Sequence, residues 1–339
     1  MSGFSTGATS EAGKAIALTV VIGALVGLVP LFGVMLMPVL PLPVAYVTFR
    51  RGLRVGAAIT FGAGVLSALL TGLGNGMLVL LLTGLVGVVV GRALARKWGF
   101  TSLLLAATAG SAAAFAGSSA VAWVLAGLDL AQFQNMFEDS LTAVSQMYDS
   151  MGIDPTVITQ ASEQLREWFD VLPYLLPSIL GVAGLMLASA TLALVAVVFP
   201  HVGERAAADL AFSRFRLHWS ASYGFIGGLG LLVLGPSLGL YGEAARLIGL
   251  NLFVFFQTLF FIQGLAVVHW LVVTRRPSAG RRAVFYGAAL VGQLLMQLTS
   301  WAGLLDTWFD YRKRFARAAP KAGSTGQAGS SGAGDQEER

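Results

Sequence analysis

Long stretches without charged residues dominate the pattern of polar and apolar positions along this chain. Asp, Glu, Lys and Arg are all absent from seven windows: 15–49, 55–91, 98–128, 171–203, 217–242, 247–274 and 283–305. A helix needs about 20 apolar residues to cross a hydrocarbon core of roughly 30 Å, where every backbone N–H and C=O must be bonded within the protein. We therefore predict an all-α fold, a polytopic transmembrane helical bundle.

Two of these windows are too long for one membrane span. At about 1.5 Å per residue, a helix over 15–49 would extend to about 50 Å, and Pro30, Pro38, Pro41 and Pro43 interrupt it. The glycine-rich segment 71–76 interrupts the window 55–91 in the same way, because glycine readily adopts turn geometry. The pattern then predicts nine spans, near 15–29, 34–49, 55–71, 76–95, 101–127, 171–199, 219–237, 247–273 and 283–303.

The basic residues predict the orientation of these spans. Four basic clusters, at 50–54, 92–97, 205–216 and 275–282, fall on one side of the membrane if the N-terminal segment 1–14 is cytoplasmic, as the positive-inside rule requires. We expect the cytoplasmic membrane as the location, with an uncleaved first helix. Nine spans would place the basic run 312–321 outside, against the positive-inside rule. Either the last segment crosses and the rule fails there, or the segment is re-entrant and does not cross. Counts of eight and nine spans therefore both stay open.

One sizeable segment, 128–170, lies between spans and is acidic, which places it outside the cytoplasm. Apolar residues recur at three- and four-residue steps from Leu130 to Met151, and a second stripe follows Asp154 and Pro155, a pair typical of a helix start. We predict an amphipathic helical hairpin, either a lid over the bundle or a pair resting on the lipid surface. Helices six to nine and a C-terminal signature occupy 171–315, and the tail 316–339 lacks apolar periodicity and is expected to be disordered.

Composition excludes several classes of function. The chain is 56% hydrophobic and 12% charged, against about 25% charged in soluble domains. Its net charge of +5 comes from basic residues beside the apolar windows, so the expected partner is the lipid bilayer and not nucleic acid. The sequence has no cysteine, no acidic residue inside a window and no Gly-Lys-Ser/Thr phosphate loop. We expect no enzyme activity, no catalytic residue, no cofactor and no metal site.

Neutral polar residues are the remaining candidates for ligand binding. Gln293 and Gln297 lie four residues apart and so share a helix face, and Asn75 lies in the glycine-rich turn expected on the outer side. Two interpretations stay open for such amides, which either hydrogen-bond neighbouring helices or line a solute site. The candidate ligand-binding residues are Asn75, Asn251, Gln263, Gln293 and Gln297.

Three segments carry a family resemblance. Residues 38–72, 248–272 and the closing GLLDTWFDYRK at 303–313 resemble the YybS-like family of bacterial membrane proteins of unknown function. The first half of that family is in turn similar to the S components of energy-coupling-factor transporters. This resemblance implies a small-molecule solute bound by the first six helices, and a transmembrane coupling subunit with ATPases as partners. It also implies that small residues on the first helix, here Gly23, Ala24 and Gly27, dock on that subunit.

The C-terminal signature supplies further candidates for partner docking, Asp306, Asp310 and Arg312. We expect both aspartates either to act as helix caps or to pair with Arg312 and Arg314 at the membrane interface, and an exposed ion pair of this kind contributes about 0–1 kcal/mol.

Two hypotheses for function follow. The first is a solute-binding or transport component that depends on partner subunits, and the second is a non-transporting scaffold or regulator that recruits cell-envelope or signalling proteins. A solvent-connected cavity near Asn75 and the polar faces of the late helices would favour the first hypothesis, and solid packing there would favour the second.

Overall fold

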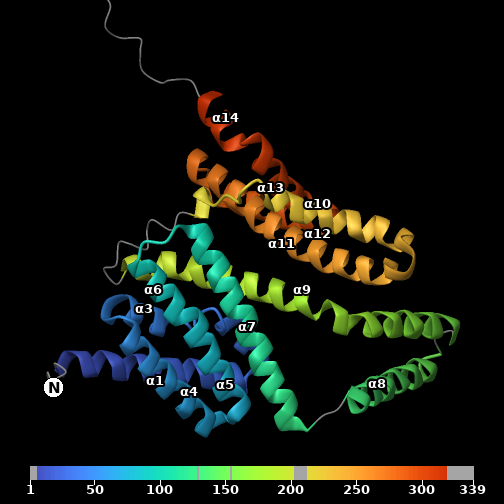
Figure 1. Cartoon of the computed structure of the whole chain (residues 1–339), viewed down its shortest axis with the longest axis horizontal. Coiled ribbons are helices and arrows are strands. Elements are labelled where there is room, and N and C mark those ends of the chain that lie inside the picture. Colours follow the sequence, from blue (N-terminus) through green and yellow to red (C-terminus); the bar gives the residue numbers. More distant parts are fainter. Residues whose placement is uncertain (1–5, 128–129, 153–154, 202–211, 319–339) are drawn as a thin grey trace, which may run out of the picture.

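The structure, a computed structural model, describes residues 6–127, 130–152, 155–201 and 212–318, and its regular elements there are all helical (Figure 1). The elements are α1 (Thr6–Leu28), α2 (Pro30–Leu36), α3 (Leu42–Arg51), α4 (Leu53–Thr71), α5 (Leu73–Leu82), the π-helical turn η1 (Thr83–Val88), α6 (Val89–Ala95), α7 (Phe100–Ala126), α8 (Leu130–Ser150), α9 (Pro155–His201), η3 (Phe212–Arg214), α10 (Ala221–Leu234), η4 (Gly235–Tyr241), α11 (Gly242–Arg275), α12 (Ala279–Met296), α13 (Leu298–Phe309) and α14 (Tyr311–Ala318).

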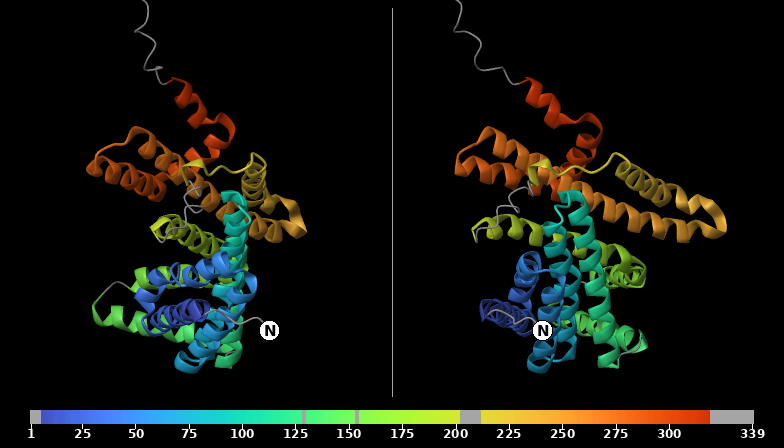
Figure 2. Two further views of the ribbon diagram at one scale, coloured as in Figure 1. Left: turned by 90° about the vertical axis from the view of Figure 1, so that its left-hand side faces the viewer. Right: turned by 60° about the vertical axis from the view of Figure 1, so that its left-hand side comes forward.

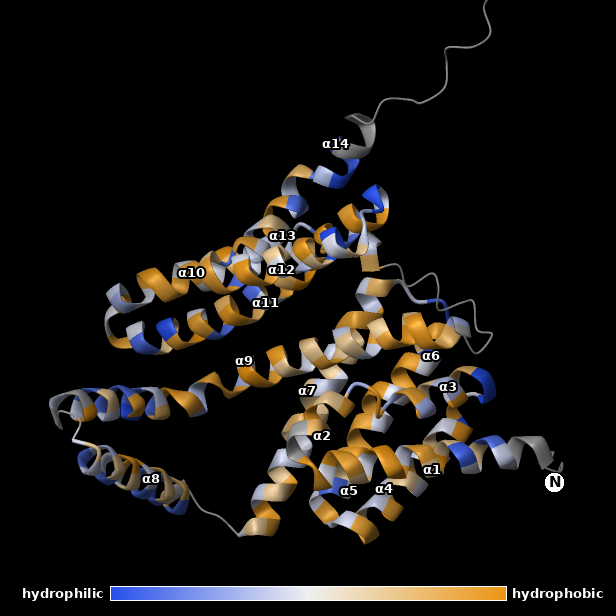
Figure 3. Cartoon of the chain, turned by 180° about the vertical axis from the view of Figure 1, so that it is seen from behind, coloured by the Kyte–Doolittle hydropathy of each residue, from blue (hydrophilic) through white to orange (hydrophobic). Residues whose placement is uncertain are grey.

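The helices form two groups on either side of α9. Helices α1 to α7 pack together on one side, and α10 to α14 lie on the other (Figures 1 and 2). Apolar residues cover most of both groups, whereas α8 and the adjoining first turns of α9 carry more hydrophilic positions (Figure 3). The long helix α9 therefore connects two apolar bundles.

Within the described residues, six helical stretches are long and apolar enough to cross a membrane. They are Ser10–Leu28, Leu53–Thr71, Leu73–Ala95, Phe100–Ala126, Ile158–Pro200 and Ala221–Arg275. The pair α12 and α13, bent by 101°, gives a seventh stretch if it is counted as one broken span. The structure thus supports a multi-pass helical membrane protein, and the count of eight or nine spans is not confirmed.

The stretch Ala221–Arg275 contains two antiparallel helices joined by η4. A Cβ atom on Gly224 would meet the ring of Phe256, and one on Gly228 would meet the backbone N of Phe253. Contacts that move backward along α11 as they move forward along α10 define a hairpin. The two separate spans expected over 219–237 and 247–273 correspond to these two helices.

The expected span 34–49 is broken into α2 and α3. Pro38 and Pro41 lie in the turn between them and have no N–H to continue a helix. Thr191 of α9 donates a hydrogen bond to the Pro38 carbonyl (3.1 Å), and Leu40 and Val44 are fully buried. This segment therefore forms a bent element inside the first bundle. The chain turns at Pro38 and Pro41 as well as at Pro30, where the only turn was expected.

Helix α9 starts earlier than the predicted sixth span. It runs unbroken from Pro155, so the second helix of the expected hairpin and the following span are one helix of 47 residues. Its first turns contact α8 through stacked Phe137 and Phe169 rings (3.9 Å) and an Arg166–Glu138 ion pair (2.8 Å). The Arg166 hydrogen bond lowers the pKa of Glu138. The two helices thus pair, while the external position of this pair stays a prediction.

A side-chain amide joins α9 to α11 beside Pro177, a proline inside α9. Pro177 lacks an N–H, and the ring of a proline inside a helix displaces the carbonyl four residues earlier. Asn251 accepts a hydrogen bond from the Ser178 N–H (3.0 Å) and donates one to the Tyr174 carbonyl (2.7 Å). An undistorted helix joins that N–H and that carbonyl directly. Asn251 therefore satisfies the backbone of α9 while it holds α11 against it.

We predict that Asn251→Leu lowers the stability of the protein in detergent. The N–H of the buried Ser178 loses its partner, which costs about 1–3 kcal/mol for a buried polar group, and the exposed Tyr174 carbonyl loses a bond as well. Thermal unfolding should show a clear loss, whereas Asn135→Leu on the exposed face of α8 should change little. Adding Pro177→Ala to Asn251→Leu should recover part of the loss. Equal stability of Asn251→Leu and the unmodified protein would contradict this role.

Candidate functional site

The C-terminal signature forms a buried polar cluster around Gln263. The side chain of Gln263 is fully buried. Its Oε1 accepts a hydrogen bond from the Leu217 N–H (3.0 Å), and its Nε2 donates to the Gly303 carbonyl (3.0 Å) and to Thr307 Oγ1 (2.9 Å). One amide of α11 therefore joins α13 to the segment that precedes α10.

A buried ion pair extends this cluster. Arg312 Nη2 lies 2.9 Å from Asp306 Oδ2, and the Asp306 side chain has no exposed surface. The guanidinium also donates to the carbonyls of Ser213 (2.6 Å) and Phe215 (2.8 Å). Burial lowers the pKa of Arg312, and the Asp306 carboxylate opposes this shift. The expectation of an exposed Asp306 pair is wrong, because α14 folds back and covers it.

Asp310 makes a second, more exposed pair beside this cluster. Its Oδ2 lies 2.9 Å from Arg216 Nη1 and 3.0 Å from Lys313 Nζ, so its partners are not the expected Arg312 and Arg314. Burial alone would raise the pKa of Asp310, but the hydrogen bonds from Lys313 and Arg216 bring it below its ordinary value.

Local backbone geometry brings the residues of the cluster together. Asp310 has a positive φ of 47° and separates α13 from α14, so Arg312 turns back toward Asp306. Gly264 and Gly303 let α11 and α13 touch, because a Cβ on Gly303 would collide with the Phe260 carbonyl. The cluster unites four of the predicted site residues: Gln263, Asp306, Asp310 and Arg312.

The small residues proposed for partner docking lie mostly against the chain itself. A Cβ on Gly23 would lie 2.7 Å from Val79 Cγ2, and one on Gly27 would lie 2.7 Å from Asn75. Asn75 Nδ2 donates to the Gly23 carbonyl (2.9 Å) and to Thr71 Oγ1 (2.7 Å). Ala24, between the two glycines, is half-buried. These residues therefore pack α1 on α5, and their roles in docking or solute binding stay predictions.

The glutamines of α12 lie at the break between α12 and α13. Gln293 Oε1 accepts hydrogen bonds from the Ser300 N–H and Oγ (both 3.0 Å), and Gln297 ends α12 with a φ of 55°. Gln297 and Ser300 line a void of about 10 Å³, beside Trp301. That volume holds about one water molecule. The structure therefore offers no space for a larger solute at this position.

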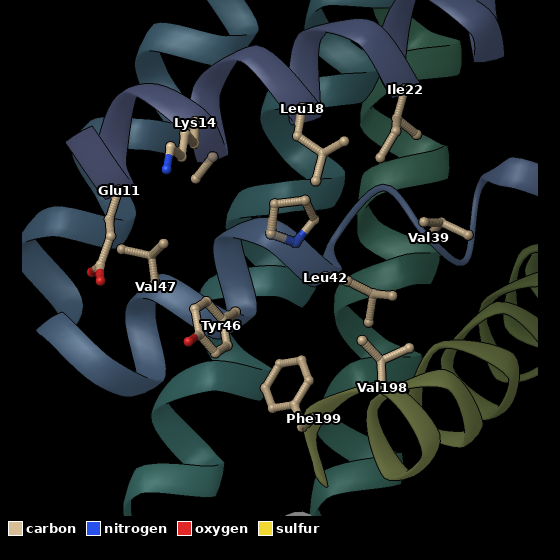
Figure 4. A pocket seen from close by; sticks show the side chains of 12 residues that line it. Glu11, Lys14, Leu18, Ile22, Val39, Leu42, Tyr46, Val47, Val198 and Phe199 are labelled. Atoms are coloured by element: carbon tan, nitrogen blue, oxygen red, sulfur yellow. The ribbon is translucent and has the colours of Figure 1, made fainter. Parts of the chain in front are cut away.

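A larger cavity lies between α1, α3 and the end of α9 (Figure 4). Its volume is about 460 Å³, within the range of about 300–1,000 Å³ typical of small-molecule sites. Apolar side chains form most of its wall: Leu18, Ile22, Val39, Leu42, Val198 and Phe199. Tyr46 of α3 contacts Phe199 of α9, with the two rings edge-to-face and their centroids 5.7 Å apart.

Charged side chains gather at one end of this cavity. Glu11 and Lys14 of α1 lie at the end marked by Val47, and Ile22 and Val39 lie at the other (Figure 4). Arg51 Nη2 pairs with Glu11 Oε2 (2.7 Å). None of the residues that line this cavity is among the site residues predicted from the sequence. The sequence pattern that indicates this cavity is the spacing of Glu11, Lys14, Leu18 and Ile22 at three- and four-residue steps. This spacing places two charged and two apolar side chains on one face of α1.

No group of three or more His, Asp or Glu side chains suited to a metal ion occurs among the described residues.

A comparison with known families matches residues 17–307 to a family described as predicted membrane protein, DUF2232. The match runs from α1 to the end of α13 and includes Gln263 and Asp306. No curated protein and no solved structure matches the chain.

We predict that Asp306→Asn destabilises the protein by about 3–5 kcal/mol, because it leaves the Arg312 guanidinium buried without a counter-charge. Asp310→Asn, in the more exposed pair, should cost about 0–1 kcal/mol. Unfolding measured in detergent separates the two. A double variant, Asp306→Leu with Arg312→Met, should be more stable than Asp306→Leu alone. Equal effects of Asp306→Asn and Asp310→Asn would show that burial of the pair has no energetic consequence.

Proposed function

The chain belongs to the DUF2232 family of membrane proteins, and we propose that its function is to bind an apolar solute within the membrane. The cavity between α1, α3 and α9 carries this proposal. In this proposal the protein is a solute-binding or transport component without enzyme activity of its own. The apolar walls of the cavity favour an apolar ligand that moves into it from water or lipid.

Three features of the cavity support binding. Its volume of about 460 Å³ suits one small ligand. Its walls come from α1, α3 and α9, helices that are distant in sequence and held in place by core packing. Thr191 of α9 also bonds the Pro38 carbonyl beside the cavity (3.1 Å). A site on packed helices keeps its shape when empty, which lowers the entropic cost of binding.

The finer expectations on topology and partners are part of this proposal. The protein resides in the cytoplasmic membrane with its N-terminus in the cytoplasm, because the basic clusters agree with that orientation. Eight crossings result if α10 and α11 each cross and the segment of α2 and α3 crosses as well, and the bent pair α12 and α13 would add a ninth. Since the sequence has no phosphate-binding loop, energy for transport comes from partner ATPases through a coupling subunit, as the likeness to S components and the YybS-like family suggests.

A second candidate function is a membrane scaffold or regulator. The observation that favours it is the close packing at the break between α12 and α13, where the void near Gln297 and Ser300 measures only about 10 Å³. In this alternative the buried pair of Asp306 and Arg312 fixes the C-terminal helix α14 in one position. The exposed side chains of Lys313 and Arg314 on α14 then face a partner protein or anionic lipid.

We predict that a neutral photoreactive probe, a diazirine derivative of hexadecanol, labels the cavity of the protein in lipid nanodiscs. Mass spectrometry of the labelled peptides should locate the adducts near Leu18, Leu42 or Val198. Leu18→Trp should remove this labelling because the indole fills the cavity. The matched control is Val21→Trp, since Val21 is also exposed on α1 (57%, against 53% for Leu18) but does not line the cavity. Labelling that Leu18→Trp leaves unchanged would overturn the proposal.

The partner proposal has its own test. Purification from native membranes in mild detergent, followed by mass spectrometry, should recover a membrane coupling subunit and ATPases in stoichiometric amounts. Recovery of cell-envelope or signalling proteins in their place would favour the scaffold. A protein recovered alone would remove partner dependence from the proposal.

A further inference from the structure

The cavity between α1, α3 and α9 has two chemically different ends. Ile22, Val39 and Val198 lie at the apolar end, and Glu11 and Lys14 lie at the other (Figure 4). Eleven residues of α1 separate Glu11 from Ile22, a distance of about 16 Å along a helix. That is about half of a hydrocarbon core of roughly 30 Å, the depth that one leaflet provides for an acyl chain. The cavity therefore matches an acyl chain in length.

The charged end has an excess of positive charge. Glu11 accepts two hydrogen bonds from Arg51, one from Nε (3.0 Å) and one from Nη2 (2.7 Å), both at Oε2. This contact balances the carboxylate, so the charge of Lys14 remains for a ligand. The Lys14 ammonium sits on a flexible apolar stem that can lie along the cavity wall and place its charge at the rim. An anionic group is complementary to this rim, and a cationic group is repelled by it.

We infer that the natural ligand is a single-chain amphiphile with an anionic head group, carboxylate or phosphate, whose head binds at Lys14. This inference rests on the proposed function, because it assigns a ligand class to the same cavity. The chain lies along the cavity from the rim at Lys14 to Ile22 and Val39, and the head stays at the polar rim. The predicted orientation places that head at the cytoplasmic surface, in the same plane as Arg51 and Arg54.

The experiment compares three photoreactive probes that share a sixteen-carbon diazirine chain: a fatty acid, a fatty alcohol and an alkyl trimethylammonium. Each is added to the protein in nanodiscs of neutral lipid, and labelling of the cavity peptides is quantified. We expect the anionic probe to label about tenfold more than the neutral probe, as one charge-assisted hydrogen bond predicts. The cationic probe should label least.

Two substitutions make the result specific. Lys14→Gln should reduce labelling by the anionic probe to the level of the neutral one, and Lys14→Glu should favour the cationic probe. Lys97→Gln is the matched control, because Lys97 is an exposed lysine at the turn between α6 and α7 and does not line the cavity. Labelling by the neutral probe should persist in all these variants, which shows that the cavity is intact.

The outcomes separate the two proposals. If none of the probes labels the cavity, the proposed function is overturned. If the neutral and anionic probes label equally and Lys14→Gln has no effect, the cavity binds apolar solutes but the anionic ligand class is wrong. Preference for the anionic probe that Lys14→Gln removes and Lys97→Gln retains supports the inference.

Discussion

Backbone groups freed at breaks in apolar helices must find partners inside the protein, and the structure depends on this constraint. Water is absent from a hydrocarbon core, so an unbonded N–H or C=O there costs several kcal/mol. Side-chain amides supply the partners. Asn251 bonds the backbone of α9 on both sides of Pro177, Gln293 bonds the first turn of α13, and Gln263 joins α13 to the segment before α10. The helices can therefore bend without losing hydrogen bonds.

This constraint also decides where a ligand is expected. Four of the five amides proposed as ligand-binding residues, those of Asn75, Asn251, Gln263 and Gln293, already bond backbone groups, so they have little free hydrogen-bonding capacity. The cavity between α1, α3 and α9 is instead lined by apolar side chains, with charge at one end. The amide side chains are used in hydrogen bonds that stabilise the fold, and apolar side chains line the cavity. The cavity therefore favours an apolar or amphiphilic ligand.

The sequence predicted the helical membrane class and most helix positions correctly. Windows without charged residues indicate helices that can cross a bilayer, and glycine-rich breaks indicate where these helices end. It predicted the pairing of Asp306 with Arg312 but not its burial, since that depends on α14 folding back at Asp310. The broken span over 34–49 and the unbroken α9 depend on tertiary contacts such as Thr191 with Pro38. The cavity involves Lys14 and Phe199, which are 185 positions apart in the sequence, and no local pattern joins them.

An experimental structure of the protein purified with its native lipids would show directly whether the cavity between α1, α3 and α9 holds a ligand. We predict elongated density in the cavity, in contact with Leu18 and Leu42 and ending beside Lys14. A cavity closed by its own side chains, with lipid density only on the outer surfaces of the helices, would contradict it.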